Sequence, residues 1–171
     1  IDCHTKPIYQ LIPGADYPHF GKRAPAGIGF GPEMTSYELG STALAGLEYY
    51  TGEQFPEAYR NSFYSGDVVT CQVNRNTMTF SGSTPIAKRE EDFLVSNDPW
   101  FRPVDVKAGP DGALYIADFY NRIIGHYEVP LNHPGRDRIS GRIWKITYKG
   151  KEAHKDVKAN DWSKASIDEL I

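Results

Sequence analysis

The sequence predicts an all-β fold made of repeated antiparallel sheets, each one a blade of a β-propeller. Aromatic residues make up 13% of the chain, and 16 Gly and 12 Pro accompany them, which favours short strands and turns over helices. An Asp followed by polar residues and an alternating strand recurs at Asp2, Asp67 and Asp118. The intervals are 67 − 2 = 65 and 118 − 67 = 51 residues, and a period near 50 is typical of propeller blades.

The last repeat, residues 100–148, has the clearest order of elements. Val104 and Val106 alternate with Asp105 and Lys107, as expected of a half-buried strand. The Gly-Pro-Asp-Gly sequence that follows supplies the backbone angles of a tight turn. We expect, in order, a strand at 102–108, a turn at 109–112, a strand at 113–117, a loop at 118–121, a strand at 123–128, an insertion at 130–140 and a strand at 141–148.

An earlier blade is predicted over residues 41–99, after the tail of a third over residues 1–40. Its strands are expected at 43–50, 62–66, 69–74 and 77–80, with a long first loop at 51–61. A Gly- and Pro-rich loop at 12–40 precedes it, and loops of this length are often functional, although a packing extension is the open alternative. Closed propellers have about four to eight blades. We therefore expect a fragment of about two and a half blades over residues 1–148.

Residues 149–171 are predicted to be a charged linker followed by the start of a helical domain, because Ser166 and Glu169 have the spacing of a capping box. The net charge of −3 provides no basic field for nucleic acid, and no apolar run reaches the length of a membrane span. Cys3 and Cys71 either pair or remain free. Neither CxxC nor CxxCH occurs, so neither a zinc ribbon nor a covalent c-type haem is predicted in this segment.

Several segments together resemble one known family. They are FRPVDVKAGPDGALYIADFYNRIIGHYEV, HPGRDR, GRIWKI, GADYPHFGK and QFPEAYRNSFYSGDVV. These are similar to the PVC-type membrane-bound dehydrogenases, bacterial propellers similar to the soluble quinoprotein glucose and sorbosone dehydrogenases. The resemblance runs from about Asp2 to Tyr148.

The resemblance implies a six-bladed propeller exported to the periplasm or the cell exterior. It further implies pyrroloquinoline quinone (PQQ) and calcium as cofactors and a sugar or polyol as substrate. Helical repeats and a c-type haem domain that accepts electrons would follow the propeller. One position departs from the pattern: Leu39 precedes Gly-Ser-Thr where the resemblance leads us to expect a His.

Propeller topology places the loop after the second strand and the start of the first strand on one face. Arg102, Asn121 and Arg122 should therefore meet there and bind the carboxylates of a quinone cofactor, since an Arg fork suits planar carboxylates. Asp67 and Asp118 are the candidate calcium ligands, because calcium prefers hard oxygen donors.

His4 is the candidate general base, because the pKa of histidine lies near working pH. His126 is a weaker candidate in a predicted strand. Tyr17, His19 and Phe20 in the long loop could cover the channel mouth and stack on a sugar. The same aromatic residues could instead cap the core.

A structural role is the alternative for each charged candidate. A recurring Asp often fixes a turn by accepting backbone N–H groups, which would explain Asp67 and Asp118. Arg102 could pair with Asp105 or Asp118. The charged loop at 133–138 could dock a neighbouring domain or form a self-contained network. These alternatives describe a non-catalytic propeller scaffold that binds carbohydrate or protein in an extracellular assembly.

Overall fold

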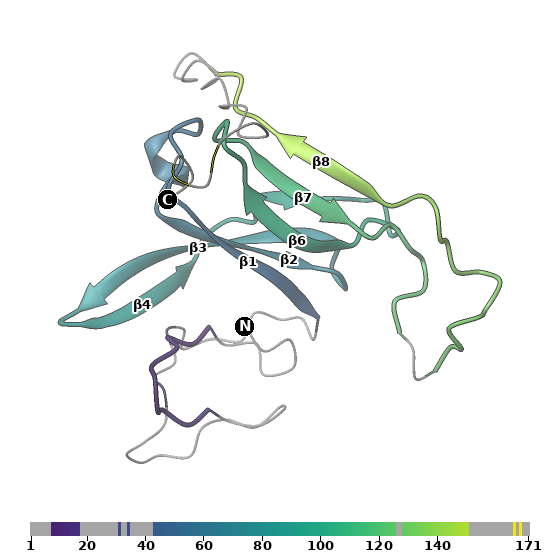
Figure 1. Cartoon of the computed structure of the whole chain (residues 1–171), viewed down its shortest axis with the longest axis horizontal. Coiled ribbons are helices and arrows are strands. Elements are labelled where there is room, and N and C mark those ends of the chain that lie inside the picture. Colours follow the sequence, from purple (N-terminus) through teal and green to yellow (C-terminus); the bar gives the residue numbers. More distant parts are fainter. Residues whose placement is uncertain are drawn as a thin grey trace.

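The computed structural model describes residues 8–17, 31, 34, 43–125, 128–150, 166 and 168. This part of the chain is almost entirely β structure in two antiparallel sheets (Figure 1). A single 3-10 turn, η1, covers Glu57–Tyr59. In these ranges no helix is long and apolar enough to cross a membrane. The strands are β1 (Leu44–Tyr50), β2 (Ser62–Asp67), β3 (Gln72–Ser81), β4 (Thr84–Arg89), β5 (Leu94–Val95), β6 (Pro103–Ala108), β7 (Leu114–Asp118) and β8 (Arg142–Ile146).

The first sheet has the order β1-β2-β3-β4, and β5 also pairs with β3. The sequence predicted two strands at 69–74 and 77–80, and this prediction was wrong, because β3 continues from Gln72 to Ser81. β2 pairs with the first part of β3, up to Thr77, and β4 pairs with the part from Asn76 onward. Both β2 and β4 pair with β3 at Asn76 and Thr77. β3 is therefore paired along its whole length, with no unpaired residue at which it would end.

The second sheet has the order β6-β7-β8. The predicted turn at 109–112 is confirmed, since the Gly109 N–H donates to the Ala113 carbonyl at 2.8 Å. The strands predicted at 102–108 and 113–117 are also confirmed to within one residue. β8 lies inside the strand predicted at 141–148 and pairs directly with β7.

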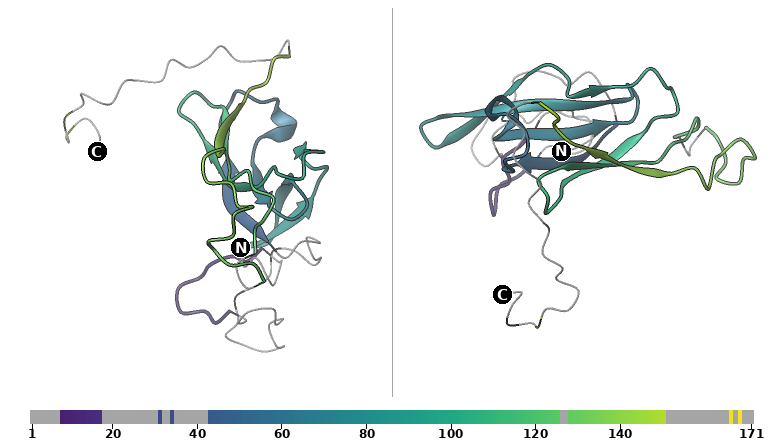
Figure 2. Two further views of the ribbon diagram at one scale, coloured as in Figure 1. Left: turned by 90° about the vertical axis from the view of Figure 1, so that its right-hand side faces the viewer. Right: turned by 90° about the horizontal axis from the view of Figure 1, so that it is seen from above.

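The strand predicted at 123–128 was wrong for residues 123–125 and 128, which are not extended strand. The Arg136 guanidinium donates to the backbone carbonyls of Ile123 at 3.3 Å and Val129 at 2.7 Å, and also to that of Gly125. A side chain thus satisfies carbonyls that a strand would have offered to a ladder. The loop between β7 and β8 consequently projects away from both sheets (Figures 1 and 2).

The two sheets pack together through their first strands, with β1 and β2 against β6. β1 has an irregularity between Ala45 and Glu48, and Gly46 has a φ of +64° there. A Cβ on Gly46 would lie 2.6 Å from the Asp105 carboxylate and 2.8 Å from its Cα, so only glycine allows this approach. The buried core between the sheets consists of Tyr50, Phe55, Tyr64, Cys71, Val73, Phe101, Val106, Leu114 and Ile116.

Candidate functional site

Asp118 ends β7 and is only 3% exposed. Its Oδ1 accepts the backbone N–H groups of Arg102 and Tyr120, both at 2.8 Å, and its Oδ2 accepts the indole N–H of Trp144 at 3.0 Å. One carboxylate therefore joins the residue just before β6, the turn after β7 and the middle of β8. Three donors satisfy this buried charge, which would be costly to bury alone.

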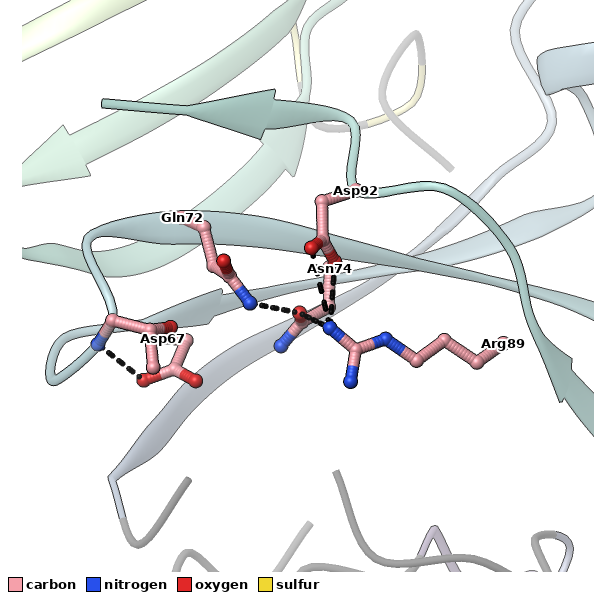
Figure 3. Close-up of polar contacts among 6 residues, drawn as sticks. Asp67, Gln72, Asn74, Arg89 and Asp92 are labelled. Atoms are coloured by element: carbon pink, nitrogen blue, oxygen red, sulfur yellow. Dashed lines mark hydrogen bonds and ion pairs between the residues drawn. The ribbon is translucent and has the colours of Figure 1, made fainter. Parts of the chain in front are cut away.

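Asp67 occupies the same place in the first sheet, as the last residue of the second strand, β2. It is fully buried, and its Oδ1 accepts the backbone N–H groups of Val69 at 3.0 Å and Thr70 at 3.2 Å. Figure 3 shows the Asp67 carboxylate turned toward its own turn. Asp67 and Asp118 therefore both fix turns through backbone N–H groups, the role that the structural alternative gave them. Asp2, the third recurring Asp, lies outside the described residues.

Arg102 joins the turns of the two sheets. Its Nε donates to the Asn121 carbonyl at 2.9 Å, while its Nη1 donates to the Val68 carbonyl at 2.5 Å and lies 3.4 Å from Cys71 Sγ. The side chain is 9% exposed. In the described part of the chain its guanidinium forms no ion pair with Asp105 or Asp118, so neither pairing considered from the sequence occurs there.

Asn121 is brought together with Arg102, whereas Arg122 is not. Asn121 is 1% exposed; its Nδ2 donates to the Asp137 carbonyl at 2.6 Å and its Oδ1 accepts the Ile123 N–H at 3.2 Å. The side chain of Arg122 is exposed to solvent. Of the three residues predicted to bind one cofactor, Arg102 and Asn121 are therefore buried and bonded to the backbone, and Arg122 is exposed.

The loop at 133–138 is held mainly by hydrogen bonds to neighbouring backbone groups, several of them outside the loop, and the described bonds include none between its Arg and Asp side chains. Arg138 donates to the Leu131 carbonyl at 2.6 Å, and Asp137 accepts the N–H groups of Ile139 and Ser140. These bonds lower the pKa of Asp137, the N–H of Ile139 being the largest contributor. These contacts of the loop therefore lie within the longer connection between β7 and β8.

Tyr17 is also bound to its own segment. Its hydroxyl donates to the Gln10 carbonyl at 2.7 Å and accepts the Ile12 N–H at 2.6 Å. Its ring meets Tyr9 edge to face at 5.8 Å between centroids. His4, His19, Phe20, His126 and Leu39 lie outside the described residues.

A further polar cluster, which the sequence did not predict, lies on the first sheet (Figure 3). Asn74 Oδ1 accepts Gln72 Nε2 at 3.0 Å and Arg89 Nη2 at 3.4 Å, and Arg89 also binds both carboxylate oxygens of Asp92 at 3.0 and 3.2 Å. Asn74 is fully buried. The four polar residues, at positions 72, 74, 89 and 92, form no recognisable motif in the sequence, because the cluster is created by the pairing of separate strands.

Comparison with known proteins places the chain in a family. Residues 32–150 match the family described as a domain of unknown function (DUF7133). The chain belongs to the DUF7133 family. No curated protein matches it.

One solved structure similar to the DUF7133 chain is described as "Crystal structure of glucose dehydrogenase". The two are 22% identical, with a TM-score of 0.45. The similarity covers 80% of this chain and 34% of the other, so the chain spans about a third of the length of that protein.

The described residues of the DUF7133 chain do not fit calcium. Calcium takes about six to eight oxygen ligands. Both oxygens of Asp118 already accept N–H donors, and so does Oδ1 of Asp67. In the described ranges no three His, Cys, Asp or Glu side chains are grouped as a metal site requires.

Arg102 and Asn121, the residues predicted to bind the carboxylates of PQQ, are already bonded to backbone groups. Two of the five N–H donors of the Arg102 guanidinium go to the Asn121 and Val68 carbonyls. Burial raises the pKa of the neighbouring Cys71 thiol, and the positive charge of Arg102 opposes this only in part. Cys71 is a free, buried thiol and not a reactive thiolate.

Proposed function

We propose that this chain supplies consecutive blades of an exported, six-bladed propeller related to the quinoprotein sugar dehydrogenases. Two features support the propeller. Each sheet ends its second strand in an Asp that fixes the following turn, Asp67 in one and Asp118 in the other. Their first strands, β1 and β6, pack beside each other, as expected of neighbouring blades around an axis.

The role that we assign to the described residues is structural: they hold adjacent blades together through hydrogen bonds between the two sheets. The observation that carries this role is the position of Arg102, whose guanidinium donates to the turn of each sheet at Asn121 and Val68. A hydrogen bond from a charged donor contributes roughly 1.5–3 kcal/mol. Arg102 therefore holds the loop ends of both blades at a fixed spacing, on the face where loops of a propeller surround its channel.

The activity we propose for the whole propeller is oxidation of a sugar or polyol, with electrons passed to a haem domain. The support is the resemblance of the motifs around residues 102–148 to PVC-type dehydrogenases. PQQ would supply the acceptor chemistry. His4 would take the proton of a substrate hydroxyl, and His19 and Phe20 would contact the sugar.

A non-catalytic scaffold is the second candidate. Leu39 replaces the expected His, and the bonds made by Arg102 and Asn121 serve the fold. In this alternative the propeller binds carbohydrate or protein in an extracellular assembly.

The deciding experiment is a PQQ titration of the full-length protein with calcium, followed by quinone absorbance and by dye reduction with a panel of sugars and polyols. The dehydrogenase proposal predicts saturable PQQ binding and sugar-dependent reduction. His4→Ala should lower the rate and leave PQQ binding in place. No binding at tens of micromolar PQQ would instead support the scaffold.

A further inference from the structure

Two aromatic rings flank the guanidinium of Arg142, the first residue of β8. Its Cζ lies 3.6 Å from the centre of the Tyr120 ring and 5.7 Å from the centre of the Trp144 ring. Both distances are within the range of cation–π attraction, which orients the side chain. Arg142 is exposed, and in the part of the chain that the structure describes its guanidinium forms no hydrogen bond or ion pair. Arg142 is therefore an oriented cation with N–H groups available to a ligand.

Asp118 holds both of these rings. Its Oδ1 accepts the backbone N–H of Tyr120 at 2.8 Å, and its Oδ2 accepts the indole N–H of Trp144 at 3.0 Å. Tyr120 has a φ of +45°, a left-handed angle that costs free energy in any residue with a Cβ. Glycine would adopt this angle more easily. The tyrosine at this position therefore indicates a use for its ring, which lies beneath Arg142.

Arg142 and Trp144 lie on the face of β8 that is turned toward the first sheet. They pair with Asp118 and Ile116 of β7, and Ile116 belongs to the core between the sheets. Trp144 also lines an apolar groove of about 360 Å³, which β5 of the first sheet lines as well. The same fixed indole ring therefore borders both the guanidinium and the groove, and both are formed by residues of the two described sheets.

This arrangement suits one class of ligand. A guanidinium with available N–H groups binds a carboxylate through two parallel hydrogen bonds. The indole N–H of Trp144 is already used, so the ring offers its apolar face, which packs against the C–H groups of a sugar. The side chain of Asn97 is exposed at the groove, and its amide can bond to sugar hydroxyls. Together these groups match a sugar that carries a carboxylate.

We propose that Tyr120, Arg142, Trp144 and the adjoining groove bind a uronate residue of an acidic polysaccharide. The carboxylate would bind Arg142, and the sugar ring would pack on Trp144. β8 is separated by β7 from β6, the strand that packs against the first sheet, so the site lies toward the outer side of its sheet, where a long polysaccharide can pass. The inference holds for a dehydrogenase and for a scaffold alike, and for a scaffold it names the class of carbohydrate.

Isothermal titration calorimetry of the full-length protein tests this proposal with two uronate trimers, tri-galacturonate and tri-mannuronate. Their methyl esters are the matched controls, because they keep the sugar rings and lose the charge. We expect at least one trimer to bind with a dissociation constant below about 1 mM. Its ester should bind at least about tenfold more weakly, since hydrogen bonds from a charged donor account for this factor. No binding of either trimer, or equal affinity for trimer and ester, would overturn the proposal.

Variants then locate the site. Arg142→Gln should remove the preference for the trimer over its ester, and Arg142→Lys should reduce it, because lysine keeps the charge without the planar fork. Arg122→Gln is the matched control, since Arg122 is also exposed but has no described ring contact, and it should leave the affinity unchanged. Tyr120→Gly removes the ring beneath Arg142 at a backbone angle that glycine accepts, and it should weaken binding several-fold. Unchanged affinity in Arg142→Gln would place the ligand elsewhere and overturn the proposal.

A hexa-glutamate peptide separates sugars from acidic polypeptides. We expect it to bind much more weakly than the better trimer, because it has no sugar ring to pack on Trp144. Equal, Arg142-dependent binding of the peptide would overturn the assignment to a sugar. None of these readouts needs PQQ or a redox dye, so failure here is distinct from failure of the PQQ titration.

Discussion

The carboxylate of Asp118 accepts the indole N–H of Trp144 at 3.0 Å, although Asp118 is buried and Trp144 is 42% exposed. A buried charge thus fixes the orientation of an exposed aromatic ring on the outer strand. The ring in turn forms a wall of the groove beside β8. The Asp that the sequence singled out as a metal ligand therefore links three strands of the second sheet.

Trp144→Phe should lower the free energy of unfolding by roughly 1.5–3 kcal/mol, because it removes a donor from a buried carboxylate. Trp100→Phe is the control, since the phenyl ring can keep the packing that Trp100 makes with Tyr120 at 5.6 Å. Urea unfolding of both variants provides the measurement. Equal losses would mean that ring packing, and not the bond to Asp118, accounts for the effect.

Gly46→Ala should disturb the packing of the two sheets and lower the stability of the protein. Its added methyl would meet Asp105, and overpacking costs about 1–3 kcal/mol beyond the cost of the left-handed backbone. Gly82→Ala is the matched control, because its φ of +62° is nearly the +64° of Gly46 and nothing lies within 4 Å of its Cβ position. Thermal unfolding should show a larger loss for Gly46→Ala. Equal losses would show that the backbone angle alone matters.

The pair of Asp111 and Lys145 predicts a pH dependence. Burial raises the pKa of Asp111, but hydrogen bonds from Lys145, Tyr115 and the Ala113 N–H outweigh it and hold the pKa below its usual 3.8. The unfolded chain therefore binds more protons at this site, and stability is lost as the pH falls through the acid range toward the folded pKa. Asp111→Asn should flatten the dependence of unfolding free energy on pH between about 5 and 3. An unchanged slope would contradict this.

Arg136→Ala should loosen the loop between β7 and β8, because its guanidinium binds the carbonyls of Ile123, Gly125 and Val129. Limited proteolysis should cut residues 123–139 several times faster in this variant. Arg138→Ala is the control, since Arg138 makes one described bond, to the Leu131 carbonyl. Equal cleavage in both variants would show that Arg136 does not organise the loop.

The sequence predicted the parts of the fold that depend on local pattern. The alternation around Val106 and the Gly-Pro-Asp-Gly turn predicted β6 and the turn after it. It failed where one side chain competes with the strand ladder, as Arg136 does at residues 123–125. The sequence also predicted two short strands in place of β3. Residue types do not reveal that β2 and β4 both pair with the middle of this strand.

The sequence predicted where four of the candidate residues lie in the two sheets, but not which groups they bond. Arg102, Asn121, Asp67 and Asp118 lie at loop ends of the two sheets, as expected from the repeat. Their hydrogen bonds go mainly to backbone groups, which no side-chain pattern can reveal. Trp144 was missed because its bond to Asp118 joins residues 26 positions apart.

The most direct test of the account is Arg102→Met in the full-length protein, with unfolding free energy and PQQ affinity both measured. If Arg102 holds two blades together, the variant loses at least about 1.5–3 kcal/mol of stability, the contribution of one hydrogen bond from a charged donor. PQQ affinity, measured where the variant is folded, stays within about twofold, and Arg122→Ala changes neither quantity. Loss of PQQ binding with unchanged stability would contradict the account and return Arg102 to the cofactor site.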